Sequence, residues 1–337
     1  MIKIAYIISK SEVGGAQTWV RDQTIAFEGE LEQYLVTNKK GWLTENARVG
    51  KYVTLRMLDS RFSIVNFIQF LVFLFENGID VVVASSANAG VYARLASLFY
   101  KCRVIYVSHG WSCIYQETSY KFFYQYIEKL LSNLTYKIIC VSENDRRKAI
   151  DIIGIDEDKL VTVRNSVLGK KIKLGLDLQS PMKILFLSRM AKPKRPDLII
   201  QAVRSLPFVT LDLVGDGPLK TINESAPNVN FLGKIDDFNE FLDYDLFALI
   251  SDSEGMPMSA LEAAASGLPL LLSNVGGCGE LIKKNGVLVE NNVDEIVSAI
   301  EAIYVNYAEY KTNALCIASE HNLDKNKHKY HSLYSAN

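Results

Sequence analysis

The amino-acid sequence predicts an α/β protein built from two doubly wound domains. Short runs of apolar residues, such as Asp80-Val81-Val82-Val83, are typical of parallel strands that are buried on both faces. These runs alternate with helical patterns along the chain, whose 337 residues exceed the usual size of one core. The strand pattern lapses between Asn165 and Pro181, where Gly169 and Gly175 also lie, so we expect the domain boundary there.

The predicted elements follow the same scheme in both halves. In the first half, strands are expected at 2–9, 33–37, 52–55, 79–84, 103–108 and 137–141. Helices are expected between them at 16–27, 63–77, 89–100 and 119–133. In the second half, strands are expected at 183–188, 208–214, 229–232, 246–250, 269–272 and 287–289, with helices between them. We therefore expect domains at 1–165 and 166–319.

Composition excludes several classes of protein. Charged residues make up 22% and hydrophobic residues 49% of the chain, which is typical of a globular protein. The formal net charge of −1 argues against nucleic acid as a partner. The longest apolar stretch, 62–75, is interrupted by Asn66 and Gln69 and is shorter than the roughly 20 residues that span a bilayer. Five cysteines without a Cys-x-x-Cys pair, and a strand rather than a leader at 1–9, favour a cytoplasmic location.

The most informative stretch is 254–262, Glu-Gly-Met-Pro-Met-Ser-Ala-Leu-Glu. It places Glu254 in a loop after a buried strand and Glu262 inside the helix that the loop opens. Pro257 suits the first turn of that helix, and Gly267 suits a left-handed cap at its end. Free amides at a helix N-terminus beside the carboxyl edge of a sheet favour a phosphate ligand. Alternatively, Glu254 only complements the helix dipole and Glu262 is an ordinary exposed residue.

This element resembles the Glu-x7-Glu signature of the GT-B retaining glycosyltransferases (glycosyltransferase family 4, group 1), which build bacterial polysaccharides. Further motifs match in order at Gly14-Gly15-Ala16, 189–194, 213–219, 231–233, 265–269, Gly276-Gly277 and 285–289. The resemblance covers nearly the whole chain and is strongest from about 183 to 290. It implies two Rossmann-like domains facing across a cleft, with the acceptor bound by 1–165 and the nucleotide-sugar donor by 166–319. In the family, the last helix, here about 320–335, packs back on the first domain.

The resemblance also implies roles for individual residues. Arg189 and Lys194 would bind the donor diphosphate. The alternative is that the basic stretch at 189–195 is only a loop exposed to solvent. Glu254 would hold hydroxyls of the donor sugar, and Glu262 would hold the ribose, because a carboxylate accepts from two adjacent hydroxyls. Arg195 stands where many relatives have glycine. Further donor contacts are implied for Gly14, Gly15, Gly233, Lys234, Gly255, Met256, Pro257, Met258 and Ser259.

Two features of the first half are also candidates for the site. His109 follows a predicted strand and precedes Gly110, and the resemblance implies a place beside the donor sugar; a structural histidine is the alternative. Gly14 and Gly15 lie at the first strand-to-helix turn, where glycine can adopt positive φ, although a tight structural turn has the same pattern. The expected catalytic residues are therefore Glu254, His109, Arg189 and Lys194. Neither a metal nor a cofactor is expected.

The helix at 119–133 has an apolar face at helical spacing that predicts a core contact. This face consists of Tyr120, Phe123, Tyr124, Ile127, Leu130, Leu131 and Leu134. Phe122 and Tyr126 lie off the face beside Lys121 and Lys129, which suggests a contact with a membrane or a lipid acceptor.

The sequence thus predicts a retaining, metal-independent hexosyl- or N-acetylhexosaminyl-transferase. It would use a nucleoside-diphosphate sugar, UDP-linked by preference, and a glycan or lipid-linked glycan acceptor in capsule or exopolysaccharide synthesis. We expect it at the inner face of the cell membrane as a cytoplasmic or peripheral protein. The alternatives are a nucleotide-sugar epimerase on the same fold and a non-catalytic partner that binds nucleotide sugar. Donor turnover separates the last alternative from an active transferase.

Overall fold

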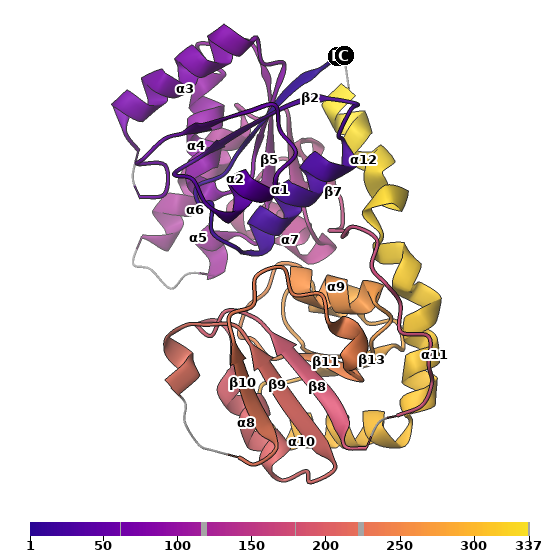
Figure 1. Cartoon of the computed structure of the whole chain (residues 1–337). Helices are drawn as coiled ribbons and strands as arrows, with labels where there is room; N and C mark the ends of the chain where they lie inside the picture. Colours follow the sequence, from indigo (N-terminus) through magenta and orange to yellow (C-terminus); the bar gives the residue numbers. More distant parts are fainter. Residues whose placement is uncertain (61, 116–119, 179, 222–225, 336–337) are drawn as a thin grey trace. The chain divides into compact units, whose positions relative to one another are not determined.

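The computed structural model describes residues 1–60, 62–115, 120–178, 180–221 and 226–335. The chain forms two compact units (Figure 1): unit 1 is Met1–Asn165 with Leu323–Asn337, and unit 2 is Ser166–Asn322. Each unit contains one parallel sheet with helices packed on it. The predicted α/β class with two doubly wound sheets is confirmed.

The sheet of unit 1 has the strand order β3-β2-β1-β4-β5-β6-β7 within the described residues. Its strands are β1 Lys3–Ile7, β2 Glu32–Thr37, β3 Lys51–Thr54, β4 Val81–Ala84, β5 Arg103–Ser108, β6 Lys137–Cys140 and β7 Leu160–Thr162. In the central register Ile4 pairs with both Gln33 and Val81, so β1 lies between β2 and β4. The strand order reverses between β1 and β4, and ligands bind at the carboxyl edge of such a switch point. Strand β7 is not predicted from the sequence.

Helices cover both faces of this sheet. They are α1 Gly15–Ala26, α2 Trp42–Asn46, α3 Ile64–Asn77, α4 Ala87–Ala96, α5 Ser112–Tyr115, α6 Lys121–Ser132, α7 Glu143–Lys148 and α12 Leu323–Ser335. One face buries Ala5 and Val82 against residues of α3 and α4. On the opposite face Tyr6 makes an edge contact with Tyr334 of α12, at 6.4 Å between ring centroids.

The C-terminal helix α12 is bound to unit 1 by paired polar atoms as well as apolar packing. The indole nitrogen of Trp19 in α1 lies 3.4 Å from the hydroxyl of Tyr330, and the hydroxyl of Tyr334 donates to Gln23 at 3.1 Å. These side chains are buried, so their polar atoms need such partners. Helix α12 therefore completes the core of unit 1 beside α1 (Figure 1).

The sheet of unit 2 has the order β10-β9-β8-β11-β12-β13 within the described residues. Its strands are β8 Met182–Leu187, β9 Val209–Val214, β10 Val229–Gly233, β11 Leu246–Leu249, β12 Leu270–Ser273 and β13 Gly286–Val289. Its helices are α8 Pro196–Arg204, α9 Met258–Ala265, α10 Val293–Val305 and α11 Tyr307–Ile317. The strand order reverses between β8 and β11. The six predicted strands of the second half are confirmed to within one or two residues at either end.

The predicted core face of α6 is wrong for four of its seven members. Tyr120, Phe123, Tyr124 and Leu130 are between 49% and 68% exposed, whereas Leu131 is buried as predicted. Polar residues take the inner positions instead: Gln125 donates to the carbonyl oxygen of Cys113, and Glu128 pairs with Arg94. No helix in the described residues is long and apolar enough to cross a membrane.

Candidate functional site

Two loops of unit 2 bring Lys194 and Glu254 together at the switch point of the sheet. Lys194 follows β8 and Glu254 follows β11, and these strands are neighbours. The Lys194 ammonium donates to Oε1 of Glu254, and the two side chains are 14% and 10% exposed. Arg189 lies at the end of β8 with its side chain exposed. The structure thus gathers two of the predicted donor-site residues into one shielded ion pair, with a second cation at the same strand end.

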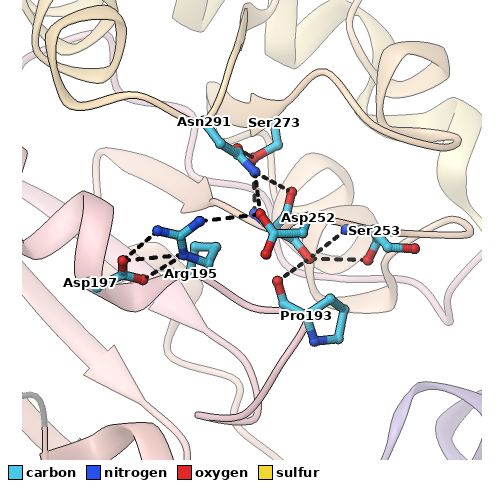
Figure 2. A network of polar contacts seen from close by, with 8 residues as sticks. Pro193, Arg195, Asp197, Asp252, Ser253, Ser273 and Asn291 are labelled. Atoms are coloured by element: carbon cyan, nitrogen blue, oxygen red, sulfur yellow. Dashed lines mark hydrogen bonds and ion pairs between the residues drawn. The ribbon is translucent and has the colours of Figure 1, made fainter. Parts of the chain in front are cut away.

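A polar network fixes the backbone of both loops (Figure 2). The hydroxyl of Ser251 lies 3.3 Å from the carbonyl oxygen of Pro193, next to Lys194. Asn291 donates to the carbonyl oxygen of Ser251 at 3.0 Å and to Asp252 at 2.9 Å. These bonds join the two loops, so the backbone positions of Lys194 and Glu254 do not depend on the ion pair between their side chains.

Arg195 belongs to the same network. Its guanidinium donates to Asp197 at 2.9 Å and 2.7 Å, and lies 3.4 Å from Asp252 (Figure 2). Its backbone N–H donates to the carbonyl oxygen of Ile250 at 2.9 Å. The arginine therefore ties the loop after β8 to Asp197, Asp252 and the end of β11.

Gly276 gives the Glu254 loop its position. Its φ is +56°, and a Cβ there would lie 1.6 Å from the carbonyl oxygen of Glu254. The N–H of Gly277 donates to the carbonyl oxygen of Gly255 at 2.7 Å. Only glycine permits this close approach, so the Gly-Gly motif predicted from sequence holds the loop that carries the first carboxylate.

Helix α9 begins at Met258, and Pro257 is its N-cap. The proline therefore lies one position before the first helical turn in which it was predicted. Met256 and Met258 are buried beside it, and Ser259 is partly exposed. Gly267 follows the helix with φ +74°, as predicted for a left-handed cap. Its carbonyl oxygen, just beyond the helix, accepts from the buried ammonium of Lys311 at 2.6 Å.

Glu262 is not an ordinary exposed helix residue. Its side chain is 14% exposed, and Oε1 lies 3.0 Å from the ammonium of Lys170. Lys170 is not predicted from the sequence as a site residue, because it lies in the irregular segment at 165–181 and shares no motif with Glu262. Both carboxylates of the Glu-x7-Glu element are therefore paired with a lysine.

Gly233 and Lys234 lie at the end of β10, the edge strand of this sheet. Gly233 has φ +74°, and Lys234 pairs with Asp236 at 2.7 Å. The Lys234 side chain is 55% exposed. These two residues share the carboxyl edge with Lys194 but are separated from it by β9.

In unit 1, His109 lies at the carboxyl end of β5 among small polar residues. Its Nε2 is 2.7 Å from the hydroxyl of Ser85, which follows β4, and Trp19 makes an edge contact with its ring at 5.4 Å. Burial lowers the pKa of His109 to about 4, so the ring is neutral at pH 7. A neutral imidazole offers one donor and one acceptor, and the contact with Ser85 uses one of them.

The expected positive φ at the first glycine turn is wrong. Gly14 is the N-cap of α1 and is extended, with φ 179°, while Gly15 is the first helical residue. A Cβ on Gly14 would lie 2.7 Å from Oε1 of Gln17, the end of a flexible side chain that can move aside, so neither φ nor space requires glycine here. No group of three or more His, Cys, Asp or Glu side chains in the described parts of the chain is arranged to hold a metal ion.

Comparisons with known proteins identify the class. The structure is similar to Anabaena Alr3699/HepE in complex with UDP and glucose, with a TM-score of 0.82 and 20% identity over 99% of this chain and 100% of that one. TarM is also similar, with a TM-score of 0.77 and 15% identity over 100% and 99% of the two chains. The two doubly wound units are those of the GT-B glycosyltransferases.

Family models and a curated relative agree with this class. The model described as Glycosyltransferase Family 4 matches residues 13–167, and Glycosyl transferases group 1 matches residues 181–306. The O-antigen biosynthesis glycosyltransferase WbnH of Escherichia coli is 41% identical over 337 residues, 99% of both chains. This chain belongs to glycosyltransferase family 4, group 1. A second Escherichia coli relative, UDP-Gal:alpha-D-GlcNAc-diphosphoundecaprenol alpha-1,3-galactosyltransferase, is 28% identical and covers 66% of this chain and 65% of its own.

Proposed function

We propose that this protein transfers a hexosyl or N-acetylhexosaminyl group from a UDP-sugar to a lipid-linked glycan in the synthesis of O-antigen or a related cell-surface polysaccharide. The observation that carries the proposal is the identity of 41% to WbnH over 99% of both chains. The structural similarity to HepE, crystallised with UDP and with UDP-glucose, supports a uridine nucleotide. The galactosyltransferase relative, whose acceptor is a sugar on diphosphoundecaprenol, supports a lipid-linked acceptor.

In the proposed reaction, Lys194 and Arg189 stabilise the leaving diphosphate. An ammonium has three N–H donors, and the contact with Glu254 uses one of them. Lys194 therefore keeps two donors for phosphate oxygens while its partner Glu254 accepts from hydroxyls of the donor sugar. Such preorganised donors act where charge develops in the transition state.

We propose that the sugar is transferred with retention on a single face. The acceptor hydroxyl oxygen bonds to the anomeric carbon as the bond to the β-phosphate oxygen breaks. The departing phosphate takes the acceptor proton, so that UDP and the glycoside are the products. Glu254 is assigned to hydrogen bonding with the donor sugar rather than to nucleophilic attack.

We also propose that unit 1 contacts the membrane that holds such an acceptor. Unit 1 carries 23 Lys and Arg against 18 Asp and Glu, a formal charge of +5, whereas unit 2 carries 14 against 20, a charge of −6. Phe122 and Tyr126 of α6 are 83% and 59% exposed, and Lys121 and Lys129 lie on the same helix. Aromatic side chains flanked by lysine favour the interface of an anionic bilayer.

Turnover of a panel of UDP-hexoses and UDP-N-acetylhexosamines tests the transfer reaction. The full chain is incubated with each donor and with N-acetylhexosaminyl diphosphoprenol, and both UDP and the elongated lipid are measured. We expect one donor to give both products and Glu254→Gln to abolish them. Stabilisation by UDP without turnover of any donor would instead favour the non-catalytic partner. Isomerised UDP-sugar formed without acceptor would favour an epimerase.

A further inference from the structure

The ammonium of Lys170 is enclosed by three groups of unit 2. It lies 3.0 Å from Oε1 of Glu262, 3.4 Å from Oδ1 of Asn239 and 5.4 Å from the ring centre of Phe241. The side chains of Lys170 and Glu262 are each 14% exposed. A carboxylate, an amide oxygen and an aromatic face together restrict the position of this ammonium group.

This contact leaves part of the Glu262 carboxylate available to a ligand. The carboxylate has two oxygens with about four acceptor positions, and Lys170 occupies one of them on Oε1. Because the lysine holds one oxygen, it restricts the orientation of the carboxylate before a ligand arrives. Its positive charge also offsets the repulsion between Glu262 and the diphosphate of a bound nucleotide.

We propose that Lys170 is a positioning residue that orients the Glu262 carboxylate to accept both ribose hydroxyls of the donor nucleotide. The proposal rests on the donor-binding function proposed above. Lys170 acts through Glu262, so its contribution depends on the ribose hydroxyls being present.

A structural role alone makes a different prediction. If the ion pair only fastens the segment around Lys170 to α9, its loss lowers the stability of unit 2 and reduces the affinity for all nucleotides equally. If it orients Glu262, its loss reduces the affinity for UDP more than the affinity for an analogue without the 2′-hydroxyl. The ratio of two affinities therefore separates the two roles.

The experiment measures the affinity of the full chain for UDP and for 2′-deoxy-UDP by titration calorimetry. We expect the wild-type protein to bind UDP about tenfold more tightly than the deoxy analogue, the size expected for a hydrogen bond to a charged acceptor. Lys170→Met should bring this ratio close to one, and Lys170→Arg should restore most of it. Lys171→Met is the matched control, because Lys171 is the adjacent exposed lysine and the charge change is the same. Its ratio should equal that of the wild type.

Several outcomes would overturn the proposal. A folded Lys170→Met variant that keeps the wild-type ratio excludes the positioning role. A wild-type protein that binds UDP and the deoxy analogue equally excludes Glu262 as the ribose acceptor. Failure of the wild type to bind UDP at all would refute the proposed donor function itself. If Lys170→Met does not fold, Lys170→Gln retains a donor without the charge, and the same ratio decides.

Discussion

Arg94 Nη1 lies 2.8 Å from Oε2 of Glu128, and this pair joins α4 to α6 inside unit 1. The arginine side chain is fully buried, and its guanidinium lies 4.1 Å from the ring centre of Tyr106. Gly90, one turn earlier in α4, makes room for the stack, since a Cβ there would lie 2.7 Å from Nη2 of Arg94. Breaking a buried pair of this kind leaves an uncompensated charge in the core.

We expect Glu128→Leu to lower the free energy of unfolding by about 3–5 kcal/mol, because it leaves the buried guanidinium of Arg94 without its carboxylate. The double variant Arg94→Met/Glu128→Leu should recover much of this loss, since neither charge is then buried. Denaturant unfolding of the full chain measures both. Glu12→Gln is the control: Glu12 pairs with Lys39 at 2.7 Å with both side chains more than half exposed. A loss as large as that of Glu128→Leu in this control would contradict the assignment.

Gly276→Ala should inactivate the enzyme through the position of Glu254. The added methyl group would meet the Glu254 carbonyl oxygen at 1.6 Å, so the loop after β11 has to move. We expect a loss of UDP-sugar turnover of at least about 100-fold, the size of effect that follows a displacement of about 1 Å in a reacting geometry. Gly29→Ala is the matched control, because Gly29 has φ +79° but no atom within 4 Å of the added Cβ. Equal losses in the two variants would show that backbone strain, rather than the clash, is responsible.

The low pKa of His109 predicts a loss of stability in acid. The folded-state pKa of about 4 lies below the usual histidine value of 6.5, so the unfolded chain binds the proton more tightly. The free energy of unfolding should therefore be unaffected by this group above pH 6.5. It should fall as the pH drops from 6.5 toward 4, by up to the order of 3 kcal/mol. Comparison with His109→Gln, whose amide does not titrate, isolates this contribution. Parallel pH profiles for the two proteins would exclude it.

The same neutral state bears on activity. Because the His109 ring stays neutral between pH 6 and 8, its replacement should not remove a titration step in this range from the profile of kcat/KM. A step near pH 6.5 that disappears in His109→Gln would show that the ring is charged during catalysis. The ring would then act on the leaving group as an imidazolium cation, and not as a neutral hydrogen-bond donor.

The placement of Lys194 and Glu254 at the ends of two strands could be predicted, because the end of a buried strand is clear from the sequence. Runs such as 246–250 are apolar and short, and their carboxyl ends lie on one edge whenever the sheet is parallel. Two loops at that edge are then neighbours wherever their strands pair, as β8 and β11 do. The pairing of Glu262 with Lys170 could not be predicted in this way, because it depends on the path of an irregular segment with no periodicity.

The error in α6 has a different physical cause. Periodicity assigns the apolar stripe to the core, which holds when the polar residues have no partners inside. Here Glu128 forms an ion pair with Arg94, and Gln125 donates a hydrogen bond to a carbonyl oxygen, so these polar side chains face inward. Arg94 lies on another helix, and nothing in the local sequence of α6 indicates it. The aromatic residues are consequently left on the outside.

That exposed surface gives the last prediction. Phe122→Ser/Tyr126→Ser should reduce co-sedimentation with vesicles containing phosphatidylglycerol by at least about tenfold, because two aromatic side chains would otherwise bury apolar area in the interface. Binding by the wild type should weaken with salt, since the +5 charge of unit 1 attracts an anionic surface over about a Debye length. Leu174→Ser/Leu176→Ser removes two exposed apolar side chains from unit 2 and should bind like the wild type. If the α6 variant also binds like the wild type, this helix does not contact the membrane.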